Sequence, residues 1–140
     1  PLATADPAAQ GAVVIVRVFN CSGQTQRDRY IGYPTAETRV TGTAEGLVSG
    51  RRVSVPLKIR KLSSPGQSAV HWEPPKEGVW LLNFRIIDPG GYYIDGILQT
   101  VVGALVPLQR GAIERRTTLV QAPASQDEID AALRSMASKD

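Results

Sequence analysis

The chain of 140 residues is short of the residue types on which disulfide-stapled, metal-binding and many catalytic domains depend. It has one cysteine, Cys21, so no disulfide can form within it and a disulfide-stapled scaffold is excluded. It has one histidine, His71, and these two side chains do not supply the ligands of a zinc site. A histidine-based triad also needs an identified nucleophile beside the base, and no flanking motif marks Cys21 as one.

Motifs of other enzyme and membrane classes are missing as well. No apolar run approaches the roughly 18 residues that a membrane helix needs. The stretch "SPGQS" is not a nucleophile elbow, and "DPGGYY" lacks the lysine and hydroxyl residue of a phosphate loop. Asp88 and Asp95 flank that glycine turn, but two carboxylates without an acidic loop make a poor calcium site. We therefore predict no enzyme activity, no metal and no cofactor.

The composition that remains is that of a globular domain with a basic body and an acidic tail. Hydrophobic residues make up 42% and charged residues 21% of the chain, which predicts one domain with a normal core. The net charge is +3, but residues 125–140 hold four acids and two bases, which leaves 14 bases and nine acids before them. This excess suits a solvated basic face, an acidic protein partner or an anionic membrane surface.

β-strands separated by glycine and proline turns dominate the pattern. The stretch "AVVIVRVFN" (12–20) is almost wholly β-branched or aromatic, which predicts a strand buried on both faces at the centre of a sheet. In "RRVSVPLKIRKL" (51–62) apolar and polar residues alternate, and Pro56 predicts an edge strand or a bulge. Shorter strands are expected at 39–43, at 69–73, and on both sides of a break at Gly103.

The stretch "VWLLNFRIID" (79–88) has the strongest strand pattern in the chain. Its even-numbered residues from Trp80 to Ile86 are apolar and predict a core-facing side. Together with the preceding "EPPKEG", this stretch resembles a strand–corner–strand of an immunoglobulin-like or transthyretin-like sandwich. The resemblance rests on Glu77, Gly78, Val79, Trp80, Leu82 and Phe84. It implies a fold class and carries no function with it.

The C-terminal stretch changes to a helical period. Ser125 and Glu128 have the spacing of a capping box, and acids crowd the first turn as the helix dipole favours. An apolar stripe follows at Ile129, Ala132, Leu133 and Met136. We expect a helix of about three turns. It should pack across an open end of the sandwich or dock on a partner as a helix in a groove.

These patterns predict an all-β fold: an immunoglobulin-like or transthyretin-like β-sandwich of about seven or eight short strands with one C-terminal α-helix. Residues 1–11 are expected to form a flexible segment, 12–122 the sandwich and 125–139 the helix. The start "PLATADPAAQGA" resembles that of an exported protein after removal of a signal peptide. We therefore expect a periplasmic or secreted location, with the cytoplasm as the alternative.

The predicted function is binding. We expect a protein-binding or assembly subunit of an envelope or secreted complex, or else a small-ligand or carbohydrate-binding module with exposed aromatic residues. Nucleic acid is not expected as a partner, because the aromatic residues do not interleave with the lysines and arginines along the chain. A membrane surface is an alternative partner for the basic face. The candidate partner-binding residues are Trp72, Tyr92, Tyr93, Arg52, Lys58, Arg60, Ile129, Leu133 and Met136.

Overall fold

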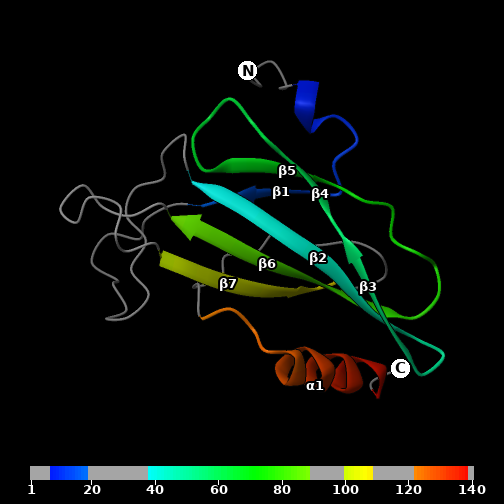
Figure 1. Ribbon diagram of the computed structural model, residues 1–140. Helices are drawn as coiled ribbons and strands as arrows, with labels where there is room; N and C mark the ends of the chain where they lie inside the picture. Colours follow the sequence, from blue (N-terminus) through cyan, green and yellow to red (C-terminus); the bar gives the residue numbers. More distant parts are fainter. Residues whose placement is uncertain (1–6, 19–37, 89–99, 109–121, 139–140) are drawn as a thin grey trace.

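The computed structural model describes residues 7–18, 38–88, 100–108 and 122–138 (Figure 1). Its elements, in chain order, are η1 (Pro7–Ala9), β1 (Val14–Arg17), β2 (Arg39–Val48), β3 (Arg51–Pro56), β4 (Lys58–Lys61), β5 (Gln67–His71), β6 (Val79–Asp88), β7 (Thr100–Pro107) and α1 (Gln126–Ala137). Here η1 is a single turn of 3-10 helix that contacts β5. The predicted mostly-β fold with one C-terminal helix is therefore confirmed.

The strands form two antiparallel sheets that face each other in a sandwich-like arrangement (Figure 1). One sheet has the strand order β1-β5-β4 and the other has the order β3-β2-β6-β7. Helix α1 lies on the side of the four-stranded sheet that faces away from the three-stranded one. Among the described strands β1 lies at an edge, although its apolar composition predicted a central position.

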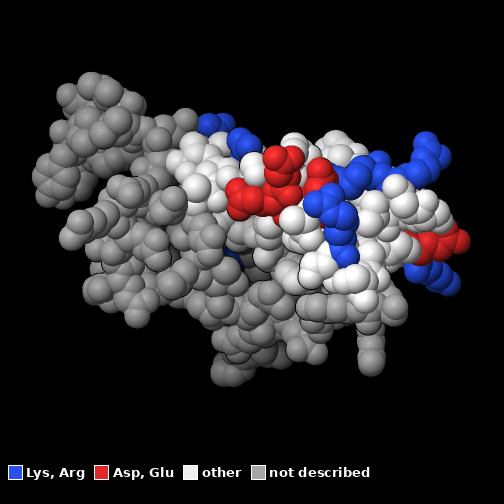
Figure 2. Space-filling view, turned by 90° about the horizontal axis from the view of Figure 1, so that it is seen from below, with Lys and Arg blue, Asp and Glu red and all other residues white. Residues whose placement is uncertain are grey.

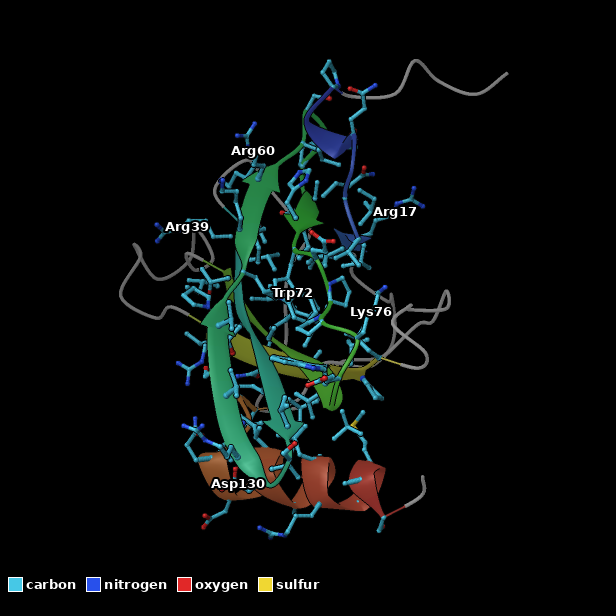
Figure 3. All side chains as sticks on the ribbon, turned by 90° about the vertical axis from the view of Figure 1, so that its right-hand side faces the viewer. Arg17, Arg39, Arg60, Trp72, Lys76 and Asp130 are labelled. Carbon is cyan, nitrogen blue, oxygen red and sulfur yellow. The ribbon has the colours of Figure 1, made fainter. Side chains whose placement is uncertain are left out.

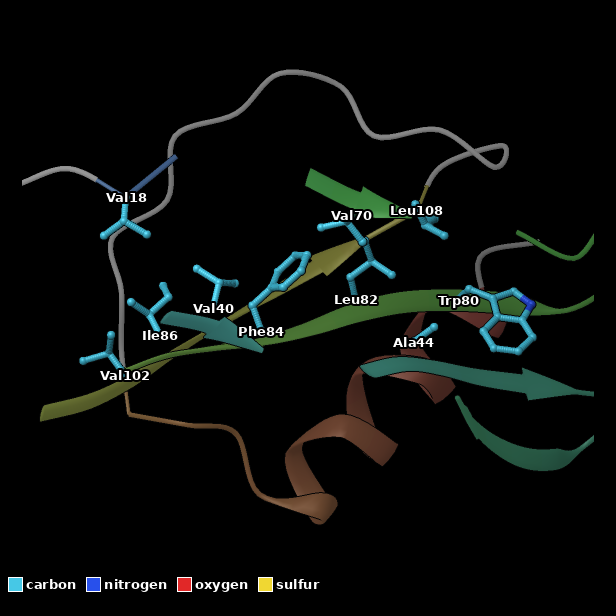
Figure 4. Packing of buried hydrophobic residues seen from close by; sticks show 10 residues of the cluster. All are labelled: Val18, Val40, Ala44, Val70, Trp80, Leu82, Phe84, Ile86, Val102 and Leu108. Atoms are coloured by element: carbon cyan, nitrogen blue, oxygen red, sulfur yellow. The ribbon is translucent and has the colours of Figure 1, made fainter. Parts of the chain in front are cut away.

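The main core fills the space between the sheets. Strand β6 contributes most to it, because its even-numbered side chains from Trp80 to Ile86 point inward and are at most 5% exposed, as predicted. The three-stranded sheet contributes Val70, which is fully buried. The buried members of this core are Val18, Val40, Ala44, Val70, Trp80, Leu82, Phe84, Ile86, Val102 and Leu108 (Figure 4).

Strand β2 is longer than predicted, because two of its glycines do not end it. A Cβ atom at Gly46 would lie 2.6 Å from the ring of Trp80, and one at Gly42 would lie 2.8 Å from the carbonyl oxygen of Asn83. These glycines therefore let a neighbouring strand and its side chains approach the backbone of β2. Gly103 likewise lies inside β7. The prediction that it separates two strands was therefore wrong.

The stretch at 51–62 was predicted as one strand, and the structure divides it between the two sheets. Strand β3 ends at Pro56 on the edge of the four-stranded sheet, and β4 begins at Lys58 on the edge of the three-stranded sheet. The predicted edge position of Pro56 is confirmed within the described strands. The alternation also holds, because Val53, Val55, Leu57 and Ile59 all pack against the main core.

Helix α1 begins at the predicted capping box. The backbone N–H of Glu128 donates to Ser125 Oγ, and the backbone N–H of Ser125 donates to Glu128 Oε1, each at 3.2 Å. Ile129 and Leu133 are fully buried against Leu81 on the outer side of β6. The helix therefore covers a sheet face of its own chain, not an open end of the sandwich. In the described part of the chain, no helix combines the length and apolarity needed to span a membrane.

Candidate protein-binding face

Helix α1 covers only part of the outer face of the four-stranded sheet. Its 12 residues span about 18 Å, whereas the ten residues of β2 or β6 span about 33 Å. The outward side chains under the helix are apolar or buried: Leu47, Val79, Leu81, Leu105 and Glu45. The other half of each strand has no helix over it among the described elements, although Pro123 of the segment before α1 lies over Gly103 of β7.

This second half presents a small mixed patch, which we call the uncovered sheet face. It consists of Arg39, Thr41, Arg85, Ile87 and Val101. Strand pairing places Arg39 beside Ile87 and Ile87 beside Val101, with Thr41 beside Arg85 in the next row. Paired residues share a face, and the alternation along each strand puts all five opposite the main core.

The uncovered sheet face combines apolar surface with two cations. Val101 is 36% exposed. Among the described residues, no other large hydrophobic side chain is classed as exposed. Ile87 beside it is half-buried, while Arg39, Thr41 and Arg85 are exposed. Interfaces between proteins favour arginine and apolar side chains and are depleted of lysine and acids. The patch therefore has the composition of a small protein-binding surface that suits a partner carrying carboxylates.

An ion-pair network fixes the helix where it meets the sheet. Arg52 of β3 donates from Nη2 to Glu45 Oε1 at 3.0 Å and from Nε to Asp130 Oδ1 at 2.5 Å. Ser54 Oγ donates to the other carboxylate oxygen of Glu45 at 2.6 Å. The network thus links β3, β2 and α1. Arg52 was a candidate partner-binding residue, and the structure uses its guanidinium within the chain.

The charges of Glu45 and Arg52 are held in place by hydrogen bonds that outweigh the cost of burial. Burial acts to raise the pKa of Glu45, but the bonds from Ser54 and Arg52 hold that pKa below its ordinary value. Burial acts to lower the pKa of Arg52, and its bonds to Glu45 and Asp130 raise it instead. The pair therefore remains charged at neutral pH and orients α1 on the sheet.

The remaining basic candidates, Lys58 and Arg60, lie away from this network. They point outward from β4, because Ile59 between them packs into the core, and both are exposed. The change of sheet after Pro56 therefore separates them from Arg52. The sequence alternation predicted that Arg52, Lys58 and Arg60 share one strand face. In the fold, Arg52 lies on one side of the sandwich, and Lys58 and Arg60 lie on the other.

Of the three aromatic candidates, Trp72 packs within the fold, and the two tyrosines lie outside the described residues. Trp72 follows β5 and is half-buried, with its ring centroid 5.3 Å from that of Trp80 at an interplanar angle of 57° (Figure 3). Trp80 is fixed in turn by its Nε1–H, which donates to the Glu77 carbonyl at 2.9 Å. Tyr92 and Tyr93 lie outside the described residues, as do Cys21, Asp95 and the basic residues between positions 109 and 121.

The helix candidates serve the fold. Ile129 and Leu133 are fully buried in the contact with β6, and Met136 packs beside them. We expected this stripe to dock on a partner. The structure corrects that expectation, because the apolar surface of Ile129 and Leu133 is already buried against Leu81. Sequence reasoning missed Arg39, Arg85, Ile87 and Val101. The outward positions of Arg85 and Ile87 follow from the alternation of β6, but nothing in the sequence says which outward positions the helix covers.

Across the described ranges, no group of three or more metal-ligating side chains comes together. His71 lies on β5 directly across from Lys58 and is half-buried. No protein-family model, no curated protein and no solved structure matches this chain.

Proposed function

We propose that this chain is a non-catalytic protein-binding domain that acts as an assembly subunit of an envelope or secreted complex. The observation that carries the proposal is the exposure of Val101 beside Ile87, with Arg39 and Arg85 around them. Covering such apolar surface is favourable by about 25 cal/mol per Å².

The partner that suits this face is a protein segment with an apolar side chain between carboxylates. The two guanidinium groups would pair with the carboxylates in the bidentate geometry that arginine favours. The apolar side chain would cover Ile87 and Val101. The alternative, a carbohydrate-binding module, has less support, because the ring of Trp72 is partly used against Trp80.

Of the two sandwich types that the sequence suggests, we favour the transthyretin-like one. In an immunoglobulin sandwich the second and third strands belong to opposite sheets. Here β2 and β3, the second and third described strands, pair as a hairpin within one sheet. This pairing supports the transthyretin-like alternative and places β3 beside the buried Glu45.

A capture experiment with matched variants tests the proposed function. The purified full chain is immobilised, exposed to envelope and secreted fractions, cross-linked, and analysed by mass spectrometry. The test variants are Val101→Ser and the double change Arg39→Gln with Arg85→Gln. The control is Lys58→Gln with Arg60→Gln, which removes the same charge from the other sheet. Thermal unfolding confirms that each variant is folded.

The proposal expects one partner that the original chain and the control capture equally and that both test variants lose. Its cross-linked segment should contain acidic residues around an apolar one. Equal capture by all variants would refute the role of the uncovered sheet face. An equal loss in the control would show a dependence on net charge alone and would also refute it.

A further inference from the structure

The three-stranded sheet differs from the rest of the molecule in its charge. Residues 13–18 and 58–71 contain its strands β1, β4 and β5, and they hold four lysines or arginines and no acid. The described acids lie elsewhere: Glu45, Glu73, Glu77, Asp88, Asp127, Glu128 and Asp130. The described residues of these two ranges therefore carry a net positive charge.

Three of these cations share the outer face of the sheet, which we call the basic sheet face: Arg17, Lys58 and Arg60. Arg60 pairs with Ala69, and Ala69 pairs with Ile15, two residues before Arg17. Because side chains two residues apart point to the same side, all three cations project away from the main core. Each of them is exposed, but Ala69 between them is fully buried and η1 contacts β5, so the three cations surround a covered centre.

The opposite side of the molecule carries acids and arginines together, since Arg39, Arg52 and Arg85 lie on the outer face of the four-stranded sheet beside α1. The first turns of α1 hold Asp127, Glu128 and Asp130 against a single described base, Arg134. Seen from the helix side, acidic side chains gather in the middle of the view (Figure 2). In Figure 3, Arg17 and Arg60 lie toward one end of the molecule and Asp130 lies at the other. Acids and arginines are mixed on the helix side, whereas the described residues of the three-stranded sheet are basic, and this difference favours one orientation toward a negatively charged surface.

We propose that the basic sheet face rests on a membrane surface that contains anionic lipids. The face has exposed cations but no exposed large apolar side chain among its described residues, so it lacks the anchors of a protein hot spot. It also lacks exposed aromatic rings on which the bases of a single-stranded nucleic acid would stack. A fluid lipid layer needs no such anchors, because its headgroups rearrange under scattered cations.

The contact is weak and orienting. A lysine or arginine near an anionic bilayer strengthens binding by about fivefold, so the three cations together account for roughly 100-fold. That is enough to turn a tethered or assembled domain toward the membrane, and stable anchoring needs a second signal. The uncovered sheet face belongs to the other sheet, so this inference does not rest on the proposed function.

Vesicle flotation tests the inference with the purified full chain. Vesicles of phosphatidylcholine alone are compared with vesicles that also contain phosphatidylglycerol, at low and at high salt. The test variant is Lys58→Gln with Arg60→Gln, and the control is Arg39→Gln with Arg85→Gln. All four positions are exposed, and both doubles remove the same net charge. Polyglutamate in place of vesicles reports on an acidic polypeptide as the alternative occupant.

We expect binding only to vesicles with phosphatidylglycerol, a loss of roughly 30-fold in the test variant, and a much smaller loss in the control. About 1 M salt should abolish binding, because the screening length falls to about 3 Å. Equal losses in both doubles, or no binding at low salt, would overturn the inference. Binding to polyglutamate without binding to vesicles would overturn it in favour of an acidic polypeptide.

Discussion

Replacing Glu45 by glutamine removes a buried carboxylate from the contact between α1 and the four-stranded sheet. The side chain of Glu45 is 3% exposed, and it accepts hydrogen bonds from Arg52 at 3.0 Å and from Ser54 at 2.6 Å. Glutamine keeps the size and one acceptor oxygen but removes the charge. The variant therefore isolates the electrostatic part of the contact and leaves the packing intact.

The magnitude follows from the two hydrogen bonds. A bond to a charged group stabilises a protein by about 1.5–3 kcal/mol and a neutral one by about 1 kcal/mol, so two bonds lose about 2 kcal/mol together. Arg52 keeps Asp130 as a partner, which prevents the larger loss that follows when a buried charge is left unpaired. The expected fall in melting temperature is roughly 4–8 °C.

The same loss should depend on pH. The pKa of Glu45 is lowered in the folded state, so its contribution is complete above its ordinary value of 4.5 and is lost as the pH falls through the folded-state value. Urea unfolding of the original chain and of Glu45→Gln, between pH 7 and pH 3, measures the difference. That difference should be about 2 kcal/mol at neutral pH and should shrink below about pH 4.5.

Glu73→Gln is the matched control, because Glu73 is exposed after β5. Its free energy of unfolding should stay within about 0.5 kcal/mol of the original at neutral pH. The reasoning fails if Glu45→Gln is as stable as the original chain at pH 7. It also fails if the loss persists undiminished at pH 3, since the protonated carboxyl should then resemble the amide.

Three further substitutions test the packing and the helix cap. Gly46→Ala should destabilise the fold by about 1–3 kcal/mol in urea unfolding, because its Cβ would lie 2.6 Å from the Trp80 ring. Leu133→Ala should lower the free energy of unfolding by about 2–5 kcal/mol in the same assay, since this side chain of α1 is fully buried against the sheet. A loss near zero would contradict the placement of the helix. Ser125→Ala should lose about 1 kcal/mol of stability, measured by thermal unfolding, whereas Ser135→Ala on the exposed helix surface should lose none.

The uncovered sheet face and the basic sheet face lie on different sheets. A domain that rests on a membrane through Arg17, Lys58 and Arg60 would keep Val101 and its neighbours available to a protein partner. The two paired double variants exchange the roles of test and control between the two experiments. Each binding property can therefore be lost while the other is retained.

Local patterns were sufficient for the elements whose residues have one plausible arrangement. In β6, apolar side chains alternate around Trp80 and Phe84, and one face had to be buried for the strand to be stable. In α1, Ser125 and Glu128 satisfy the first free N–H groups of the helix, so its start could be read directly. Pro56 has no N–H to donate, so it could lie only where a strand has no partner on that side.

The tertiary structure decided what the same residues contact. Gly42 and Gly46 look like strand breaks along the chain, and only the neighbouring β6 shows that they make room for its backbone and for Trp80. The stripe on α1 looks the same whether it binds a partner or its own sheet, because an apolar face gains equally from any apolar surface that covers it. Arg52 and Lys58 likewise look alike in sequence. The change of sheet after Pro56 places one beside a buried carboxylate and leaves the other exposed on the opposite sheet.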